Sequence, residues 1–237
     1  MEYKMNYIMP EDCVDGQGNV YADAVLEIFQ RGAGEHGEKM GVGFEKMLQR
    51  HLLWVVTHIR YQVCGKIKAG QQVVLTTWPL PATRLGYERN YLICDTEGNE
   101  LIRGVSLWVL IDTQNRRLAS GADVYPQGEY RTDKLFGDRI RRLRDFENNG
   151  EGVTMIPDES YIDNNGHVNN TKYALMAHRA LGEIGAKVKG FQIDYIHEVM
   201  CAQPLTLYTQ QQDDTLQVKG VSEDSTRMFA CSFVLDN

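Results

Sequence analysis

The hexamer DNNGHV at residues 163–168 repeats, in altered form, the hexamer DGQGNV at residues 15–20. Both have aspartate first, an amide side chain third, glycine fourth and valine sixth. Each follows a short segment that opens with proline and acidic residues, Pro10-Glu11-Asp12 and Pro157-Asp158-Glu159. The hexamers begin about 150 residues apart, whereas the repeats of solenoid proteins have periods of roughly 20–50 residues. The pattern therefore indicates a duplicated domain.

A helical pattern follows each hexamer. Residues 21–31 have apolar side chains at helical spacing, and residues 171–182 repeat this pattern. Both segments lack proline and end near a glycine, as helices commonly do. The apolar positions are Ala24, Val25, Ile28 and Phe29 in the first segment and Tyr173, Leu175, Met176 and Leu181 in the second. Each half of the chain is therefore expected to contain one long helix.

Strand-like runs follow each predicted helix. They lie at about 51–64, 72–79, 86–95 and 100–112 in the first half, and at about 189–199, 204–211, 215–222 and 226–235 in the second. Residues 95–99 and the pair Asp213-Asp214 are typical of hairpin turns. A single amphipathic helix must bury its apolar side, and a curved sheet wrapped around it does so. The predicted fold class is α+β, with two tandem hot-dog domains, each a long helix wrapped by an antiparallel sheet.

The domain boundaries follow from the repeat. We expect an N-terminal hot-dog domain at 1–125, a connector at 126–150 and a C-terminal hot-dog domain at 151–237. The connector contains proline, glycines and the basic run Arg139–Arg144. Such a composition is typical of a loop, and we expect the connector to lie on the surface.

The composition excludes several classes of protein. The net charge of −7 argues against a general nucleic-acid binder, which is usually basic. The five cysteines are scattered and form no CxxC pair, and the six histidines lack metal-ligand spacing. We therefore expect no disulfide framework, no metal site, no bound cofactor, and a cytoplasmic location, where thiols stay reduced. No apolar run reaches the ~18 residues of a transmembrane helix, and the N-terminus does not read as a secretory signal.

Residues 163–173, DNNGHVNNTKY, resemble the D-x-N-x-H-V-N-N-x-K-Y signature of the acyl-acyl-carrier-protein (acyl-ACP) thioesterases of plants and bacteria. Residues 54–63 and the stretches 106–110 and 116–118 are similar to further parts of that family. The resemblance implies hydrolysis of a fatty acyl thioester carried by acyl carrier protein (ACP). The products are free fatty acid and holo-ACP, so ACP is the implied partner.

The same resemblance assigns a catalytic group. It falls on Asp163, Asn165 and His167, with Glu198 on the strand after the second helix. Plant members have a cysteine directly after that glutamate, whereas this chain has Val199. A cysteine mechanism is therefore disfavoured, and we expect direct attack by water.

Hydrolysis of a thioester requires a base for water and donors for the carbonyl oxygen, whereas a thiolate leaves readily. Glu198 or Asp163 is the expected base. His167 is expected to orient the water or to shuttle the proton, because imidazole titrates near neutrality. Asn165 holds the water or the carbonyl, and backbone N–H groups near Val168 stabilise the oxyanion.

Chain lengths allow this arrangement. A helix of ~15 residues spans roughly 22 Å, and a strand from 191 to 198 spans about 23 Å. A strand that returns antiparallel to the helix therefore places Glu198 beside the start of the helix. Glu198 also alternates in phase with Gln192 and Asp194, which is typical of a solvated strand face.

The first hexamer lacks an imidazole, because Asn19 stands in place of His167 and Gln17 in place of Asn165. We expect one active site per chain, in the C-terminal half, and an acyl tunnel in the N-terminal half. The glycine-rich segment 32–44 either leaves room for an acyl chain or breaks the helix. A structural alternative for residues 163–170, DNNGHVNN, is an Asx-rich turn that caps a helix.

Three other functions stay open. An acyl-CoA thioesterase performs the same chemistry, a hydroxyacyl dehydratase of this fold uses a histidine and a carboxylate, and a non-catalytic protein binds acyl thioesters without turnover. The basic run Arg139–Arg144 suits either solvent or an acidic carrier protein. The sequence leaves open the acyl chain length and whether two copies form a homodimer.

Overall fold

The structure is a computed structural model that describes residues 1–15, 18–83, 86–148, 150–163, 166–181 and 187–236. The chain divides into two compact units. The first unit comprises residues 1–9, 28–65 and 70–140, and the second comprises residues 10–27, 66–69 and 141–237. Residues 10–27, which include the first hexamer, thus group with the second unit. The domain boundaries expected from the sequence stay a prediction.

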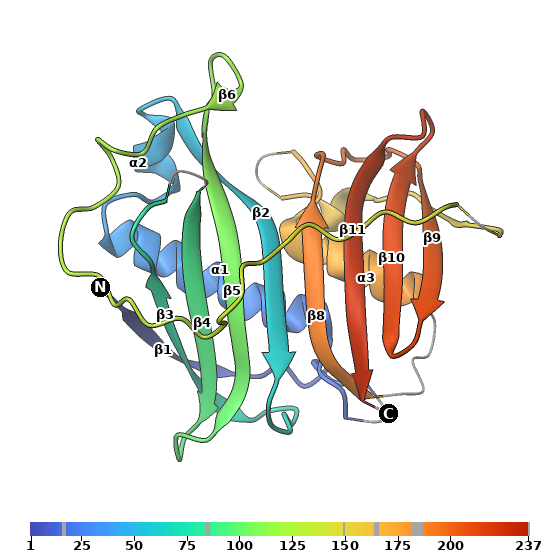
Figure 1. Cartoon of the computed structure of the whole chain (residues 1–237), viewed down its shortest axis with the longest axis horizontal. Helices are drawn as coiled ribbons and strands as arrows, with labels where there is room; N and C mark the ends of the chain where they lie inside the picture. Colours follow the sequence, from blue (N-terminus) through green and yellow to red (C-terminus); the bar gives the residue numbers. More distant parts are fainter. Residues whose placement is uncertain (16–17, 84–85, 149, 164–165, 182–186, 237) are drawn as a thin grey trace. The chain divides into compact units, whose positions relative to one another are not determined.

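The first unit is an antiparallel sheet packed against a long helix (Figure 1). Its strand order is β1-β3-β4-β5-β2, and β6 pairs with the end of β5. The strands are β1 (Tyr3–Ile8), β2 (Leu52–Val63), β3 (Gln72–Pro79), β4 (Tyr87–Asp95), β5 (Glu100–Asp112) and β6 (Arg117–Leu118). The helices are α1 (Ala22–Lys39) and the short α2 (Phe44–Leu48). Phe29 of α1 stacks on Tyr91 of β4 with 4.2 Å between the ring centroids, which fixes the helix against the sheet.

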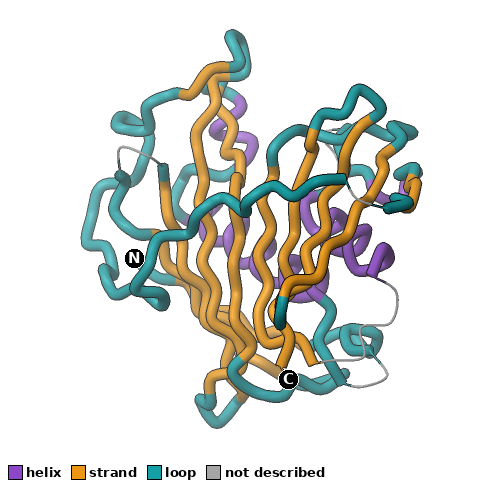
Figure 2. The backbone as a smooth tube through the Cα atoms, turned by 45° about the vertical axis from the view of Figure 1, so that its right-hand side comes forward, coloured by secondary structure: helices purple, strands orange, loops and turns teal. Residues whose placement is uncertain are grey.

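The second unit repeats this arrangement. Its strand order is β8-β11-β10-β9-β7. The elements are β7 (Val153–Met155), the 3₁₀ turn η1 (Glu159–Tyr161), α3 (Asn170–Leu181), β8 (Lys187–Tyr195), β9 (Leu205–Gln212), β10 (Thr215–Ser222) and β11 (Arg227–Asp236). Tyr173 of α3 packs edge-on against Phe229 of β11, with 5.1 Å between the ring centroids. In Figure 2 each sheet, drawn in orange, has a purple helix against one face. The predicted α+β class with two hot-dog domains is confirmed.

Helix α1 is longer than predicted. The pattern at 21–31 continues to Lys39 through three glycines, so the glycine-rich segment does not break the helix there. A Cβ atom at Gly32 would lie 2.2 Å from Leu75 Cδ2 of β3. Gly32 therefore lets the helix approach the sheet closely, and packing of the helix outweighs the low helix propensity of glycine. The space at Gly32 is filled by Leu75, so it is not the room for an acyl chain that the glycines suggested.

Strand β8 is shorter than predicted. It ends at Tyr195 rather than near 199. The N–H groups of Ile196 and His197 both donate to the single carbonyl of Met228, at 3.0 and 2.9 Å, so the backbone leaves the regular ladder at this point. Glu198 consequently lies on the loop after the strand, not on a strand face with Gln192. The alternative of a solvated strand face is thereby wrong for Glu198.

The segment 126–148 forms neither helix nor strand and runs over the surface. In the first unit, Trp78 Nε1 donates to the Asp133 carbonyl at 3.0 Å. In the second unit, Leu143 N donates to a carboxylate oxygen of Asp194 at 2.5 Å. Figure 1 shows the segment crossing the face of each sheet that is turned away from its helix. Polar contacts with the two sheets therefore hold the connector in place. Among the described residues, no helix is long and apolar enough to cross a membrane.

Candidate active site

The second hexamer forms a tight turn before α3. Asp163 N donates to the His167 carbonyl at 2.9 Å, and Gly166 N donates to the Asp163 carbonyl at 3.0 Å. Gly166 has a φ of 81°, in the left-handed region that glycine adopts without steric cost. This turn sets the direction in which His167 leaves the backbone. Asn165, the predicted holder of water or carbonyl, lies outside the described residues.

Asn169 begins the helix that follows. Its Oδ1 accepts from Thr171 N at 3.0 Å and from Thr171 Oγ1 at 3.1 Å, which is the geometry of an N-cap. The helix cap expected from the structural alternative is therefore present within residues 163–170, and Asn169 forms it. His167 is left available for another contact.

His167 meets Glu198, as the sequence predicts. Its Nε2 lies 3.3 Å from Glu198 Oε2. The side chains are 29 % and 50 % exposed, so a substrate approaching from solvent can reach both. Val168 N donates to the Val199 carbonyl at 2.8 Å, and His167 pairs with Met200 in an isolated antiparallel bridge. These backbone contacts join the turn to the loop after β8 and fix the imidazole beside the carboxylate.

Tyr173 holds the same loop from the helix side. Its hydroxyl oxygen accepts from Val199 N at 3.0 Å, and its side chain is almost fully buried. Burial raises the pKa of Tyr173 to about 12, which the hydrogen bond from Val199 opposes and the negative charges of Glu198 and Asp163 reinforce. The phenol therefore stays neutral at physiological pH. Sequence reasoning treated Tyr173 as a core residue, although its place in the K-Y end of the signature was a signal.

Asp163 and Glu198 both act electrostatically on this phenol. Asp163 stands at the start of the turn, half-buried, with its backbone paired to His167. Glu198 lies in direct contact with the imidazole ring of His167. The structure thus brings Asp163, His167 and Glu198 into one small region, and either carboxylate remains a candidate base.

The first hexamer forms the same turn. Asp15 N donates to the Asn19 carbonyl at 2.9 Å, and Gly18 N donates to the Asp15 carbonyl at 3.0 Å. Gly18 has a φ of 81°, the same value as Gly166. The internal repeat predicted from the two hexamers is therefore confirmed in the backbone. The side chains differ, because Asn19 Nδ2 donates to Asp15 Oδ2 at 2.8 Å.

The position of Glu198 also has a counterpart in the first repeat. Ala202 N donates to the Pro157 carbonyl at 2.8 Å, and Gly70 N donates to the Met9 carbonyl at 3.0 Å. Ala202 and Gly70 both have positive φ, at 58° and 66°. Counting back four residues from each leads to Glu198 in the second repeat and to Lys66 in the first. The first repeat therefore has lysine in place of the glutamate, which sequence reasoning did not find because the match depends on backbone contacts.

A groove of about 420 Å³ opens beside the Glu198 loop. Its lining includes His197 and Gln203 of that loop and Ser222, Thr226 and Met228 of the β10–β11 hairpin. All of these residues belong to the second unit. The groove is mostly polar and lies next to Glu198 in the chain.

Comparison with known proteins places the chain in a family. Residues 1–126 match the model of the acyl-ACP thioesterase N-terminal domain. The chain belongs to the acyl-ACP thioesterase family. The resemblance seen in the signature is thereby confirmed, and it extends to the half of the chain that does not contain the signature.

Curated members of the family include chloroplastic plant enzymes. The chain is 30% identical over 165 residues to an acyl-ACP hydrolase of Cuphea viscosissima, and this alignment covers 64% of this chain and 40% of that protein. It is 25% identical over 195 residues to the oleoyl-ACP thioesterase of Coriandrum sativum, and this alignment covers 73% of this chain and 52% of that protein. The matches thus span about half or less of these relatives' length.

Solved structures of family members have the same fold. An acyl-ACP thioesterase from Bacteroides thetaiotaomicron superimposes with a TM-score of 0.89 at 19% identity, over 99% of this chain and 98% of that chain. The 12:0-ACP thioesterase from Umbellularia californica gives a TM-score of 0.85 at 19% identity, over 99% and 97%. The double hot-dog fold is therefore that of the acyl-ACP thioesterases along the whole chain.

Proposed function

We propose that this member of the acyl-ACP thioesterase family hydrolyses fatty acyl-ACP to free fatty acid and holo-ACP. The observation that supports this most directly is the contact between His167 and Glu198 at the N-terminal end of α3. The relatives are named as acyl-ACP hydrolases or thioesterases, and the chain matches them in family and in signature. An imidazole and a carboxylate in contact are the groups that a water-attack mechanism needs.

Water attacks the thioester carbonyl in the proposed mechanism. Glu198 or Asp163 accepts the proton of the water, and His167 orients the water or relays the proton. The bond between carbonyl carbon and sulfur then breaks, and the thiolate of the carrier leaves without a strong general acid. General acid–base catalysis of this kind typically contributes about 10²- to 10⁴-fold to the rate.

The sequence predicts that backbone N–H groups at the start of the helix near Val168 stabilise the oxyanion. Val168 N is already bonded to the Val199 carbonyl, so it is not available for the substrate. Within the described part of the chain, the N–H of Asn170, the first residue of α3, has no hydrogen-bond partner. The N-terminal end of a helix carries partial positive charge, which stabilises a developing oxyanion. We therefore assign Asn170 N as the backbone donor.

Direct attack by water is favoured over a cysteine nucleophile. Val199, which stands where plant members have cysteine, is completely buried. Cys201 is exposed, and its sulfur lies 4.0 Å from the Pro157 carbonyl. Neither position brings a thiolate to the His167–Glu198 contact.

Side-by-side assays test this function. Acyl-ACP and acyl-CoA of one chain length are supplied at equal concentration, and released thiol and free fatty acid are both quantified. We expect both products in equal amounts, with a higher kcat/KM for acyl-ACP. A higher kcat/KM for acyl-CoA would favour the acyl-CoA thioesterase. Loss of water from a 3-hydroxyacyl thioester without thiol release would identify a dehydratase, and tight binding without turnover would identify a non-catalytic binder.

Location and assembly are further parts of the proposal. We infer that the protein works in the cytoplasm, because its five cysteines are all free thiols. The plant relatives are chloroplastic, so fractionation of the source cells decides this point. The homodimer left open by the sequence is tested by light scattering of the purified chain.

A further inference from the structure

Three arginines of the connector form a cationic surface in the second unit. These residues, Arg141, Arg142 and Arg144, are called here the arginine strip, and all three are exposed. In the described part of the chain none of them forms an ion pair or a side-chain hydrogen bond. We propose that the arginine strip is the docking surface for the acidic carrier protein that delivers the acyl thioester. This inference rests on the proposed function and names where its partner binds.

The backbone of the strip is held firmly. Gln192 Nε2 donates to the Arg141 carbonyl at 2.7 Å, and Leu143 N donates to Asp194, whose side chain is completely buried. Asp145, two residues after Leu143, forms an ion pair with the buried Lys219 at 2.9 Å. A surface that is already ordered loses less conformational entropy when a partner binds. The strip is therefore better suited to recognition than a mobile basic tail.

The nearest acidic residue on each side of the strip in sequence forms an ion pair elsewhere. Asp145 contacts Lys219 and also Arg227, the latter at 3.3 Å. On the other side in sequence, Asp138 of the first unit pairs with Arg60 at 2.8 Å. These carboxylates therefore face basic residues of the sheets and leave the charge of the strip uncompensated. An uncompensated local charge of this kind attracts a partner of opposite sign and speeds the encounter.

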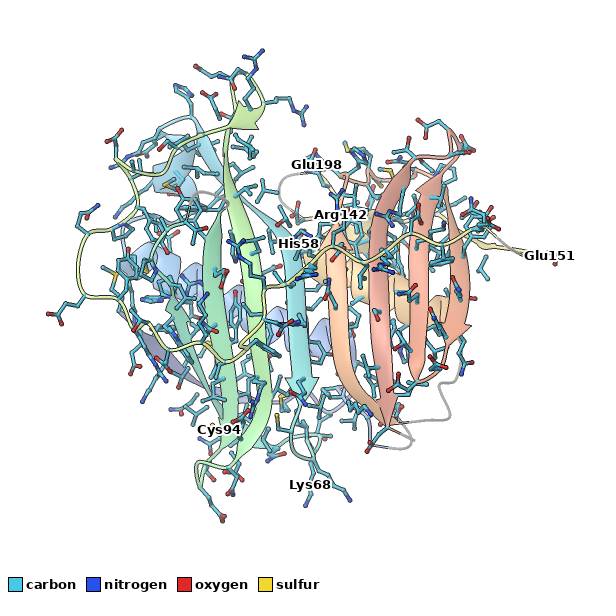
Figure 3. The ribbon with its side chains drawn as sticks, viewed as in Figure 1. His58, Lys68, Cys94, Arg142, Glu151 and Glu198 are labelled. Carbon is cyan, nitrogen blue, oxygen red and sulfur yellow. The ribbon has the colours of Figure 1, made fainter. Side chains whose placement is uncertain are left out.

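The strip lies close to the candidate active site. Asp194, which anchors Leu143, precedes Glu198 by four residues, and four residues span at most about 14 Å. Figure 3 shows Arg142 on the connector and Glu198 toward the same end of the second unit. A carrier protein bound at the strip would therefore hold its flexible arm within reach of the His167–Glu198 contact.

The cationic arginine strip contrasts with the negative net charge of the whole chain. The net charge is −7, so the chain as a whole repels an acidic partner. Long-range repulsion combined with a local cationic surface restricts where an acidic partner binds. A nucleic acid would also be attracted to arginines, but the chain has no overall positive charge to support such binding.

Charge reversal tests the strip. The double variant Arg142→Glu with Arg144→Glu is compared with a matched control, Lys46→Glu with Arg50→Glu, which changes the net charge equally on exposed residues of the first unit. Hydrolysis of acyl-ACP is measured beside hydrolysis of acyl-pantetheine, a small uncharged thioester. Binding of holo-ACP is measured separately by titration calorimetry.

We expect the strip variant to lose at least about tenfold in kcat/KM for acyl-ACP and in affinity for holo-ACP, with the acyl-pantetheine rate within about twofold of wild type. The difference from wild type should shrink as salt rises from 0.05 to about 0.5 M. The control variant should keep both activities and the affinity.

Each other result has a defined meaning. Wild-type affinity for holo-ACP in the strip variant would overturn the docking surface. An equal loss in the control variant would show that only total charge matters and would also overturn it. A protein that binds holo-ACP through the strip but hydrolyses neither thioester would overturn the proposed function and leave the docking surface standing.

Discussion

The turn at residues 15–20 and the turn at residues 163–168 share a backbone and differ in what their side chains can do. In the first turn, the Asn19 side chain folds back onto Asp15 and is 8% exposed. In the second turn, His167 reaches outward to Glu198. A turn of one geometry therefore serves as a structural element in one repeat and as a candidate catalytic element in the other.

The residues around the two turns also differ in the catalytic groups that they offer. Lys66 occupies the place of Glu198, so the first repeat lacks both the imidazole and the carboxylate. Counting from the hexamers along the helices, Val25 occupies the place of Tyr173 and has no hydroxyl to hold a neighbouring loop. The backbone of the duplicated turn thus persists where the groups needed for water attack are absent, because its hydrogen bonds need only aspartate, glycine and the peptide groups.

The strongest way to break the comparison is to convert the second turn into the first. His167→Asn should lower kcat for acyl-ACP hydrolysis by about 10²- to 10⁴-fold, because the imidazole that orients or relays the proton is lost. Thiol release measures the rate, and circular dichroism measures the fold. Asn19→Ala is the matched control in the first turn and should retain activity within about twofold. Near-wild-type turnover in His167→Asn would mean that the two turns do not differ in function.

The second prediction decides which carboxylate is the base. Glu198→Gln keeps the shape of the side chain and should lower kcat by about 10²-fold or more, because an amide cannot accept the proton of water. Lys66→Gln, the equivalent change in the first repeat, should have no effect. Asp163→Asn is assayed beside them. A larger loss for Asp163→Asn than for Glu198→Gln would transfer the role of base to Asp163.

The third prediction concerns the hydrogen bond between Tyr173 and the loop that carries Glu198. Tyr173→Phe removes the acceptor for Val199 N and should lower kcat about tenfold with KM nearly unchanged, because Glu198 is then less well positioned. Tyr91→Phe is the matched control, since Tyr91 is equally buried in the first unit and its hydroxyl contacts Ser106 at 2.9 Å.

Both substitutions should cost about 1 kcal/mol of unfolding free energy, as the loss of one buried hydrogen bond commonly does. Only Tyr173→Phe should change kcat. Equal kcat in the two variants would show that Tyr173 contributes packing alone, and urea unfolding supplies the stability comparison.

The smallest predicted effect tests the imidazole that does lie near the first turn. His178 of α3 packs edge-on against Tyr21, with 4.9 Å between the ring centroids. Burial lowers the pKa of His178, and the nearby charges of Asp23 and Asp15 oppose this shift only in part. The folded state therefore favours the neutral ring, and stability should fall as the pH drops from about 6.5 towards the lowered pKa.

His178→Asn should weaken this acid-side loss of stability and leave the rate at pH 7 within about twofold. The measurement is the urea midpoint at pH 7 and pH 5 for wild type and variant. A large loss of turnover in His178→Asn would assign chemistry to the first turn after all. An unchanged pH dependence would remove His178 from the acid-labile groups.

Much of the fold was predictable because its signals are local. The strands at 72–79, 100–112 and 215–222 begin and end where alternation and turn residues place them. The end of α1 was missed because Gly32, Gly34 and Gly37 lower helix propensity, while close packing of Gly32 on Leu75 depends on β3. The end of β8 was missed because it depends on the Met228 carbonyl in another strand.

The candidate site was predictable only in part. The family resemblance identified Asp163, His167 and Glu198, and the chain lengths allowed their approach. Only hydrogen bonds between distant segments show that Tyr173 contacts the Glu198 loop and that Lys66 stands at the matching position of the first repeat. The oxyanion donor expected among the backbone N–H groups near Val168 stays a prediction, and only the structure shows that the N–H of Val168 itself joins the turn to the Glu198 loop.

The amino-acid sequence by itself determined the duplication, the two helix-and-sheet repeats and the chemical groups available for catalysis, because these depend on residue type and short-range spacing. Only the tertiary structure decided that the imidazole meets Glu198 and that the N–H of Asn170 has no hydrogen-bond partner in the described part of the chain. It also decided that the connector presents its arginines uncompensated. Each of these depends on contacts between residues far apart in the chain, such as Val168 with Val199 and Leu143 with Asp194. No local pattern specifies such contacts, since they form only when the helix and sheet pack together.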